Sequence, residues 1–397
     1  MIDWKKNEYK KNFISIVFLG IVLRIILFLF LGTNNQSEWE YGTIAQNITD
    51  NKGYSFYYFD DGKLTHEIKE DSNPSPSAYM APGYVFLLVA IKYISSPLLE
   101  NYIIFGFNII FFIATMLYLF KITNRFFGVR VSLIALIIYS VVPEFIYTSY
   151  SIGTTQIYHL FLALIIYYFL ESENKYVLPA IFGVAILFRF ELFLLLLIIA
   201  TLTLIKKQYS KTVLLLIIPS LFLTPWIIRN YQEFNQFIPF STTGGLNLYR
   251  GNNEIMIGGW HNFNTLEKLN KFNGDTSKIE IFLDKMYIEE AINYITTDYS
   301  TSTINIVKKF FFFWFINPNE EKALNIIYII PWFTMLSLSI FGLSMNKKIP
   351  AIFLSIIIYH TLLSVVFIPL LRYQNMMKIV LIPIAAYGLA TLIKKKE

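Results

Sequence analysis

Long apolar runs separated by short polar stretches recur along almost the whole chain. A helix needs about 20 apolar residues to cross the roughly 30 Å of hydrocarbon in a bilayer. The pattern therefore predicts an all-α, polytopic membrane protein with about ten transmembrane helices. The predicted spans are residues 12–32, 99–120, 131–148, 153–170, 175–188, 190–205, 212–228, 324–344, 350–370 and 374–393.

Two long polar segments, residues 33–98 and 229–323, interrupt this pattern. Both are rich in the Gly, Asn, Asp and Ser residues that are typical of turns. Each also contains a shorter apolar run: 80–95, which we expect to form an interfacial or re-entrant helix, and 304–316, which suits the headgroup region. We therefore expect a single membrane domain, 1–397, whose two long loops carry interfacial helices.

The basic residues predict the orientation of the chain. Lys and Arg are concentrated in short loops and at the two ends, and cytoplasmic loops carry an excess of these residues. With ten spans, all of these clusters fall on one side, so both termini should be cytoplasmic and both long segments external, in a bacterial-type plasma membrane. The basic N-terminus precedes a long apolar run with no small-residue cleavage site, which favours a retained first span. The clusters are Lys5, Lys6, Lys10 and Lys11; Lys121, Arg125 and Arg130; Lys206, Lys207 and Lys211; Lys347 and Lys348; and Lys394, Lys395 and Lys396.

The composition agrees with the membrane class and excludes several functions. Only 15% of residues are charged, against about 25% in soluble domains. The net charge of +6 does not indicate nucleic-acid binding, because the basic residues lie in loops and at the ends. The chain has no Cys, which excludes disulfides, Cys-ligated zinc and thiol nucleophiles. The four His residues are scattered without ligand spacing, so we expect His159 and His360 to have hydrogen-bonded packing roles.

The stretch after the first apolar run places two carboxylates close together. Ser37 followed by Glu40 matches a capping box, and apolar residues at helical spacing follow over 41–48. Glu38 and Glu40 are two residues apart and point to different sides of a helix, so they do not form a catalytic pair. On local grounds Glu40 closes the cap, and Glu38 is an acid placed favourably near a helix N-terminus.

This stretch resembles the first external loop of the GT-C superfamily of polytopic membrane glycosyltransferases. The similarity is to the protein mannosyltransferases and aminoarabinose transferases, which are like glycosyltransferase family 39. Further motifs follow in the family's order over about 35–385, which makes the set specific although each one is weak. They are Met80-Ala81-Pro82-Gly83-Tyr84, Phe188-Arg189-Phe190-Glu191, Pro225-Trp226-Ile227-Ile228-Arg229-Asn230-Tyr231, Thr243-Gly244-Gly245-Leu246-Asn247-Leu248-Tyr249 with Gly251-Asn252-Asn253, and Leu371-Arg372-Tyr373.

The resemblance implies a glycosyltransferase that uses a polyprenyl-phosphate-linked sugar at the outer face of the membrane. The acceptor would be a glycan, a lipid or a protein. A single inverting displacement needs a base for the acceptor proton and positive charge for the departing phosphate. The resemblance assigns the base to Glu38, where the family usually has Asp, and Glu40 is the alternative.

The same resemblance implies which residues contact the substrate. The phosphate candidates are Arg229, Arg372, Arg189 and Arg250, because the guanidinium fork donates two parallel hydrogen bonds; Tyr84 and Asn252 are the candidates from the other motifs. Arg229 and Arg372 also fit snorkelling at span ends, and Arg189 fits a local pair with Glu191.

The residues imply no cofactor with certainty. Some relatives use a divalent metal, so a metal stays open. However, Gln156 stands where relatives often have an acid, and an amide there weakens the case for a ligand at that position.

The alternative function is a transporter or flippase of lipid-linked glycans. It explains the spans and the mid-span Arg24, which should face protein or a wet cavity because a charge at that depth is costly. It does not explain two long external segments with an acid at a helix start, and the chain shows no inverted repeat.

Overall fold

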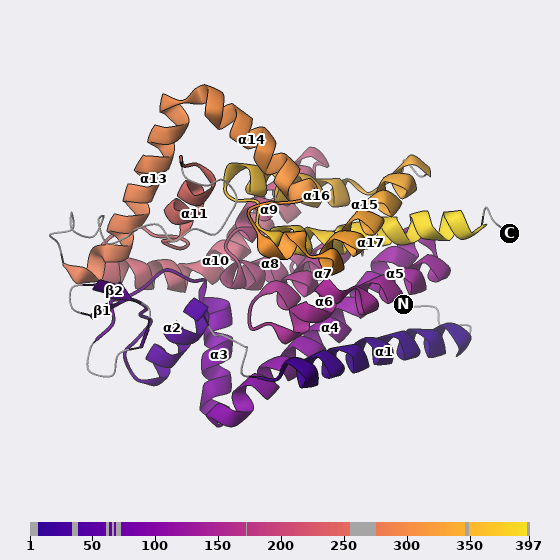
Figure 1. Cartoon of the computed structure of the whole chain (residues 1–397), viewed down its shortest axis with the longest axis horizontal. Coiled ribbons are helices and arrows are strands. Elements are labelled where there is room, and N and C mark those ends of the chain that lie inside the picture. The colour runs from indigo at the N-terminus through magenta and orange to yellow at the C-terminus, as the bar shows by residue number, and fades with distance from the viewer. Residues whose placement is uncertain are drawn as a thin grey trace.

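The computed structural model describes residues 7–33, 39–60, 63–65, 67–68, 73–171, 173–254, 275–345 and 349–394. Sixteen α-helices, two short 3-10 helices and one antiparallel hairpin lie in this part of the chain (Figure 1). The elements are α1 (Asn7–Leu31), α2 (Trp39–Thr49), β1 (Tyr58–Asp60), β2 (Lys63–Thr65), α3 (Pro82–Ile94), α4 (Pro97–Phe127), α5 (Val129–Val141), α6 (Pro143–Tyr150), α7 (Thr155–Glu171), α8 (Val177–Phe188), α9 (Leu192–Ile205), α10 (Tyr209–Phe234), α11 (Gly244–Gly251), η1 (Thr276–Lys278), α13 (Ile279–Thr297), α14 (Tyr299–Trp314), η2 (Glu321–Leu324), α15 (Ile326–Met345), α16 (Ala351–Val366) and α17 (Leu371–Lys394).

The helices confirm an all-α membrane protein but do not show ten spans. Within the described residues, five helices are long and apolar enough to cross a bilayer: α1, α4, α10, α15 and α17. The pair α5 and α6, bent by 59° at the break before Pro143, makes a sixth if it is one span. The remaining apolar runs form helices of 10–17 residues. α8, with 12 residues, is only about 18 Å long at 1.5 Å per residue.

The core of the bundle is built around α17, which packs most closely against α15. A Cβ atom added at Gly342 would lie 2.5 Å from the Ile384 carbonyl oxygen, and one at Gly388 would lie 2.2 Å from that of Leu338. Both positions therefore require glycine for the two backbones to approach. Small residues at helix contacts are typical of membrane bundles, where van der Waals packing drives association.

Arg24 of α1 is fully buried and joins α1 to α5 and α6. Its Nε donates to Ser149 Oγ at 2.9 Å. Its terminal nitrogens donate to the backbone carbonyls of Gly20, Tyr139, Ser140 and Phe145. The expectation that this mid-span charge faces protein is confirmed, and carbonyl oxygens are its partners. Gln156, whose side-chain oxygen accepts from Thr148 and Ser149, extends the same buried network.

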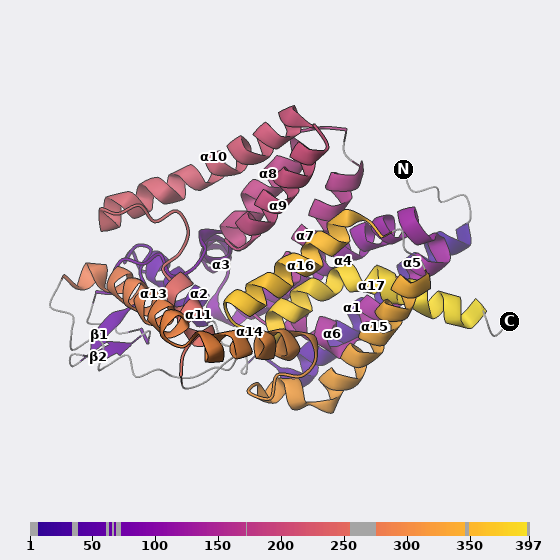
Figure 2. The same ribbon diagram turned by 90° about the horizontal axis from the view of Figure 1, so that it is seen from above.

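The two ends of the molecule differ in character. Both termini lie at one end, whereas α2, the β1–β2 hairpin, α11 and the start of α13 lie at the opposite end (Figures 1 and 2). The two long polar segments of the sequence therefore meet on one side of the bundle. We refer to this side as the loop end.

Candidate active site

Glu40 lies at the loop end, in the first turn of α2, where its side chain is half-buried. Ile44 and Ala45 on the same helix are fully buried, and α2 packs against α3. This amphipathic face anchors the helix and keeps its first turn at the edge of the packed loops. Glu38 and Ser37 lie outside the described residues.

Tyr84 of α3 packs against α2 through Tyr41. Its ring meets that of Tyr41 edge-on, with 5.2 Å between centroids, and its hydroxyl accepts a hydrogen bond from the Gly153 amide at 2.9 Å. Only 1% of Tyr84 is exposed. It therefore packs behind the predicted site and holds Tyr41, which follows Glu40 directly.

The electrostatics of Tyr41 identify the charges around this helix. Burial raises the pKa of Tyr41; the positive charges of Arg189 and Arg372 oppose that rise, and the carboxylates of Glu191 and Glu40 add to it. Residues from three distant parts of the chain therefore act on one phenol beside Glu40.

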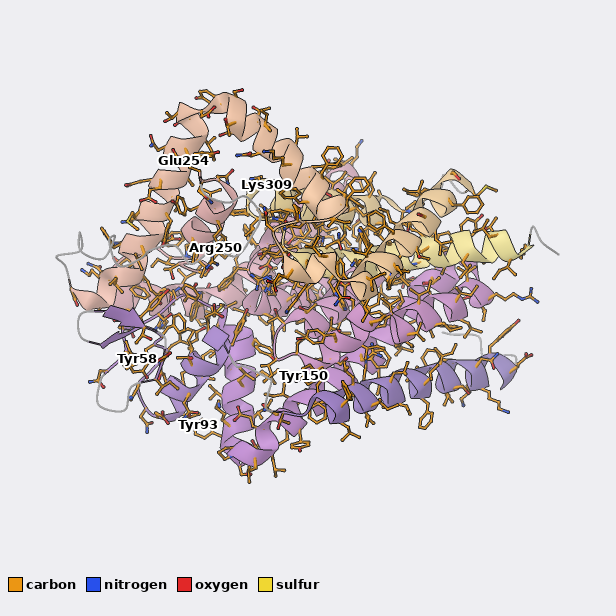
Figure 3. All side chains as sticks on the ribbon, viewed as in Figure 1. Tyr58, Tyr93, Tyr150, Arg250, Glu254 and Lys309 are labelled. Atoms are coloured by element: carbon orange, nitrogen blue, oxygen red, sulfur yellow. The ribbon has the colours of Figure 1, made fainter. Side chains whose placement is uncertain are left out.

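Arg250 brings a further charge from the second long segment. Burial lowers the pKa of Arg250, Tyr79 and Glu40 raise it, and the like charge of Arg372 lowers it again. Tyr79 in turn has a raised pKa from burial and from Glu40, which Arg250 opposes. Glu40, Arg250 and Arg372 thus lie within electrostatic range of one another. Figure 3 shows Arg250 on α11, which packs against α13.

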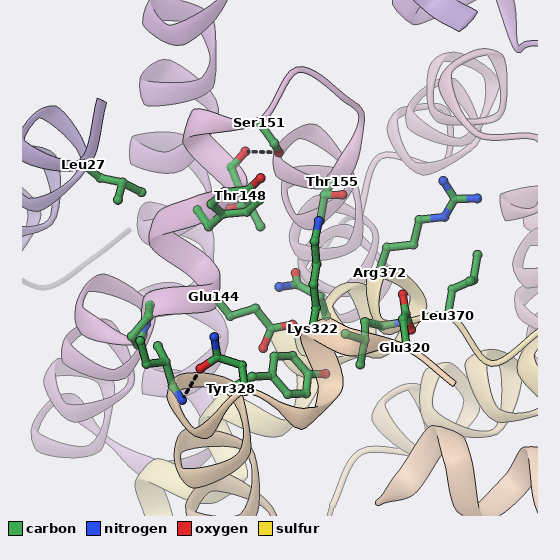
Figure 4. Close-up of a pocket in the computed structure, with 16 residues that line it drawn as sticks. Leu27, Glu144, Thr148, Ser151, Thr155, Glu320, Lys322, Tyr328, Leu370 and Arg372 are labelled. Carbon is green, nitrogen blue, oxygen red and sulfur yellow. Dashed lines mark hydrogen bonds between the residues drawn. The ribbon is translucent and has the colours of Figure 1, made fainter. Parts of the chain in front are cut away.

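A cavity of about 620 Å³ opens beside Arg372. Glu320, Lys322 and Arg372 line one side, and Glu144 and Tyr328 line another (Figure 4). Its other lining residues are mostly apolar or small hydroxyl residues that lie in, or directly beside, α1, α6, α7, α15 and α17: Leu27, Pro143, Tyr147, Thr148, Ser151, Thr155, Asn325, Ile327, Leu370, Leu371 and Asn375. Arg372 is exposed; it lines this cavity and also acts electrostatically on Tyr41 and Arg250.

Arg189 is paired, as its proximity to Glu191 suggested. Its Nε donates to Glu191 Oε1 at 2.6 Å, and Nη1 donates to Thr154 Oγ1 at 3.2 Å. The pair sits in the short turn between α8 and α9. Arg189 thus donates hydrogen bonds to a carboxylate and a hydroxyl. It acts on the site electrostatically, through the effect of its positive charge on Tyr41.

Arg229, in the last turns of α10, binds the first long loop. It donates to the carbonyl oxygens of Ser77 and Tyr54 and to the side chain of Asn230 at 3.1 Å. Its guanidinium also lies 5.2 Å from the centroid of the Tyr54 ring. These contacts account for an Arg in the last turns of α10 without a phosphate.

Asn252 follows α11 and is buried. Its amide nitrogen donates to Leu248 O and Val366 O, and its oxygen accepts from Nζ of the buried Lys309 at 3.0 Å. Figure 3 shows Lys309 on α14. Asn252 therefore joins α11 and α14 to the end of α16.

His159 and His360 have the hydrogen-bonded packing roles that the sequence predicted. His159 contacts the Tyr139 hydroxyl and Asn375 O, and His360 contacts the Tyr158 hydroxyl and Ile356 O. His66 and His261 lie outside the described residues. Among the residues that are described, no three His, Asp or Glu side chains are grouped to hold a metal ion.

Three residues near the site escaped the sequence analysis: Glu144, Lys378 and Glu280. Lys378 forms an ion pair with Glu144, and both residues lie inside predicted spans. A charge at such depth is a functional or structural signal by itself. Glu280 lies on the buried face of α13 with Tyr287 and Ala291. The signal in the sequence was an acidic residue at a position where the helical spacing places apolar side chains.

The central part of the chain matches a known family. Residues 80–228 match the dolichyl-phosphate-mannose-protein mannosyltransferase family. The resemblance read from the motifs is thereby confirmed for those residues, which make up less than half of the chain. No curated protein matches the chain in sequence. The protein is an integral membrane protein with several apolar spans.

Solved structures of an Archaeoglobus fulgidus oligosaccharyltransferase share the fold. The complex of AglB with an inhibitory peptide and a dolichol-phosphate has a TM-score of 0.56 at 12% identity, over 99% of this chain and 51% of that chain. The form tethered to an acceptor peptide has a TM-score of 0.60 at 13% identity, over 99% and 50%. The apo form has 0.57 at 13%, over 100% and 52%. The chain thus spans about half the length of these structures.

Proposed function

We propose that the protein is a membrane glycosyltransferase that moves a sugar from a polyprenyl-phosphate donor to an acceptor on the outer face of the membrane. The observation that carries the proposal is the electrostatic interaction of Arg250 with both Glu40 and Arg372, together with the cavity that Arg372 lines. These three residues come from the two long loops and from the start of the last long helix. The match of 80–228 to mannosyltransferases and the shared fold support the same reaction class.

The chemistry we assign to this site is one inverting displacement. The carboxylate accepts the proton of the acceptor hydroxyl, whose oxygen forms a bond to the anomeric carbon. The bond from that carbon to the phosphate oxygen breaks, and the electron pair leaves with the phosphate. Arg250 and Arg372 stabilise the growing charge, because guanidinium donors in a partly dry site are strong electrostatic stabilisers. Glycans, lipids and proteins are all candidate acceptors.

The cavity beside Arg372 suits the donor. Ligand pockets are mostly apolar with a few placed polar groups, and here the apolar wall accompanies the cations Arg372 and Lys322. Asn375 also lines the cavity, and its buried side-chain oxygen has no hydrogen-bond partner among the described residues. A polyprenyl chain against the apolar wall would bring its phosphate to the arginine side.

The base is either Glu38 or Glu40, and their two isosteric variants separate these possibilities. Purified protein would be supplied with a polyprenyl-phosphate sugar and an extract of acceptors, and donor loss would be measured. We expect Glu40→Gln or Glu38→Gln to lower turnover by at least about 100-fold, the usual contribution of a general base. Full turnover in both variants would refute the mechanism. Donor that crosses the membrane without cleavage would instead show a flippase.

We further propose that both termini are cytoplasmic and that the loop end is external. The opposite placement of the termini and of the long loops supports this orientation (Figure 1). Because the chain has no Cys, single cysteines can be labelled without background. A cysteine in the β1–β2 hairpin should react with an impermeant maleimide in intact cells, and one at the C-terminus should not; the reverse pattern would overturn the orientation.

A further inference from the structure

The segment 73–81, which we refer to as the strap, links the two long loops at the site. The Ser75 amide donates to Tyr57 O at 2.7 Å, and the Ser77 amide donates to Tyr54 O at 2.9 Å. The Tyr54 hydroxyl donates to Met80 O at 2.8 Å. The strap contains Tyr79, on whose phenol the charges of Glu40 and Arg250 act.

The middle of the strap is held from three directions. Arg229 of α10 donates to Ser77 O, and the Thr242 amide donates to Ala78 O at 3.1 Å. The Ala78 amide donates to Oε2 of Glu280 at 2.9 Å. Of the three contacts, only the last depends on a group that titrates near neutral pH.

Glu280 joins both long loops through one oxygen atom. The same Oε2 accepts from the Thr242 hydroxyl at 2.7 Å. One carboxyl oxygen on α13 therefore binds both the strap and the segment that leads into α11. Only 2% of Glu280 is exposed. Its other oxygen, Oε1, is buried and has no hydrogen-bond partner among the described residues.

The groups that face Glu280 are few. Arg229 on α10 and the Ser77 side chain act on it directly. On the first loop, Tyr54, Tyr57 and Tyr79 each feel its charge. Arg229 is therefore the cation that acts on Glu280 most strongly, and that cation already donates to two carbonyl oxygens.

We propose that Glu280 is a positioning residue whose protonated form holds the strap, and with it Tyr79, in place beside Glu40 and Arg250. The inference about turnover rests on the proposed glycosyltransferase function; the inference about the strap does not. A proton on the carboxyl removes a buried charge, while the Oε2 acceptor for both loops is kept.

The direction of the pH effect follows from linkage. Burial raises the pKa of Glu280 from its ordinary 4.5 to about 7. The opened strap exposes the carboxyl and binds its proton less tightly than the closed strap does. The stabilisation of the closed strap is therefore complete below pH 4.5 and is lost as the pH rises through about 7.

The test compares Glu280→Gln with the wild type and with Glu289→Gln. The amide oxygen of Gln can accept both hydrogen bonds but cannot ionise, and Glu289 is an exposed acid on the same helix. Hydrogen exchange at the Ala78 and Tyr79 amides, corrected for intrinsic rates, reports strap opening. Donor turnover over the same pH range reports the site.

We expect strap protection in the wild type and in Glu289→Gln to fall about tenfold from about pH 6 to about pH 8, because opening couples to one proton. Turnover should fall in parallel. Glu280→Gln should keep protection and turnover nearly constant over this range, and Glu280→Ala should lose protection at every pH. An unchanged pH dependence of exchange in Glu280→Gln would overturn the proposal. If neither the wild type nor any variant consumes donor but exchange behaves as expected, the proposed glycosyltransferase function is refuted, whereas the proposed role of Glu280 in holding the strap is supported.

Discussion

Removal of one partner of the ion pair between Glu144 and Lys378 should lower the stability of the bundle strongly, because the other charge would stay buried without a partner. Lys378 of α17 donates to Glu144 Oε2 on α6 and to the Tyr328 hydroxyl of α15. The side chain of Lys378 is 1% exposed and that of Glu144 is 16% exposed. The ammonium also lies 4.3 Å from the centroid of the Tyr328 ring and 4.6 Å from that of Trp332.

Lys378→Met removes the cation and leaves the carboxylate partly buried. Loss of one partner of a buried pair costs about 3–5 kcal/mol, because the remaining charge is uncompensated. Replacement of both partners by neutral groups is often close to neutral. We therefore expect Lys378→Met to lose about 3–5 kcal/mol of stability, and the double variant Glu144→Gln/Lys378→Met to lose no more than about 2 kcal/mol, mainly from the lost cation–π contacts.

The assay is unfolding of the detergent-solubilised protein by SDS titration, followed by tryptophan fluorescence. The control is Arg125→Gln, because Arg125 and Glu171 form a pair whose side chains are each 40% exposed. That exposed pair should contribute only about 0–1 kcal/mol. If Lys378→Met and the double variant lose equal stability within about 0.5 kcal/mol, removal of the remaining carboxylate relieves no penalty, and the reasoning about the buried pair is refuted.

Two further predictions concern the contact between α11 and the loop before α17. A Cβ atom at Gly251 would lie 1.4 Å from the Phe367 carbonyl oxygen, whereas Gly106 has open space. Gly251→Ala should therefore lower the SDS midpoint strongly, and Gly106→Ala should raise the free energy of unfolding by about 0.5–1 kcal/mol and the midpoint slightly. Equal midpoints in the two variants would contradict this. Burial lowers the pKa of Lys309 from 10.5 to about 8, so between these values the unfolded chain binds a proton that the folded chain does not, and stability should rise with pH across this window. Lys309→Met should flatten that rise, and an unchanged slope in the variant would contradict the assignment.

The sequence predicted the helices well because a bilayer imposes a strict rule on apolar length. Each predicted apolar run contains a helix, and the short runs 80–95 and 304–316 became α3 and part of α14. Ten spans are not shown among the described residues, because hydropathy alone does not indicate where a helix ends. The run 131–148 is divided at Pro143, and Arg189 and Glu191 separate two helices too short to cross alone.

The site was only partly predictable, because loops are ordered by contacts between distant residues. Glu40, Arg250 and Arg372 were selected by their motifs, and the fold brings them together. Arg229 was selected in the same way, yet its donors hold the carbonyl oxygens of Ser77 and Tyr54. An arginine that binds backbone has the same local sequence as one that binds phosphate.

The central claim, that Arg250 and Arg372 receive the phosphate of a polyprenyl lipid, is tested most directly by binding of the leaving lipid itself. Native mass spectrometry of the detergent-solubilised protein would compare polyprenyl phosphate with the uncharged polyprenol. We expect the wild type to bind the phosphate at least about tenfold more tightly, which corresponds to about 1.4 kcal/mol, and Arg372→Gln and Arg250→Gln each to remove most of that difference while polyprenol binding is unchanged. Equal preference for the phosphate in the wild type and in both variants would contradict the account.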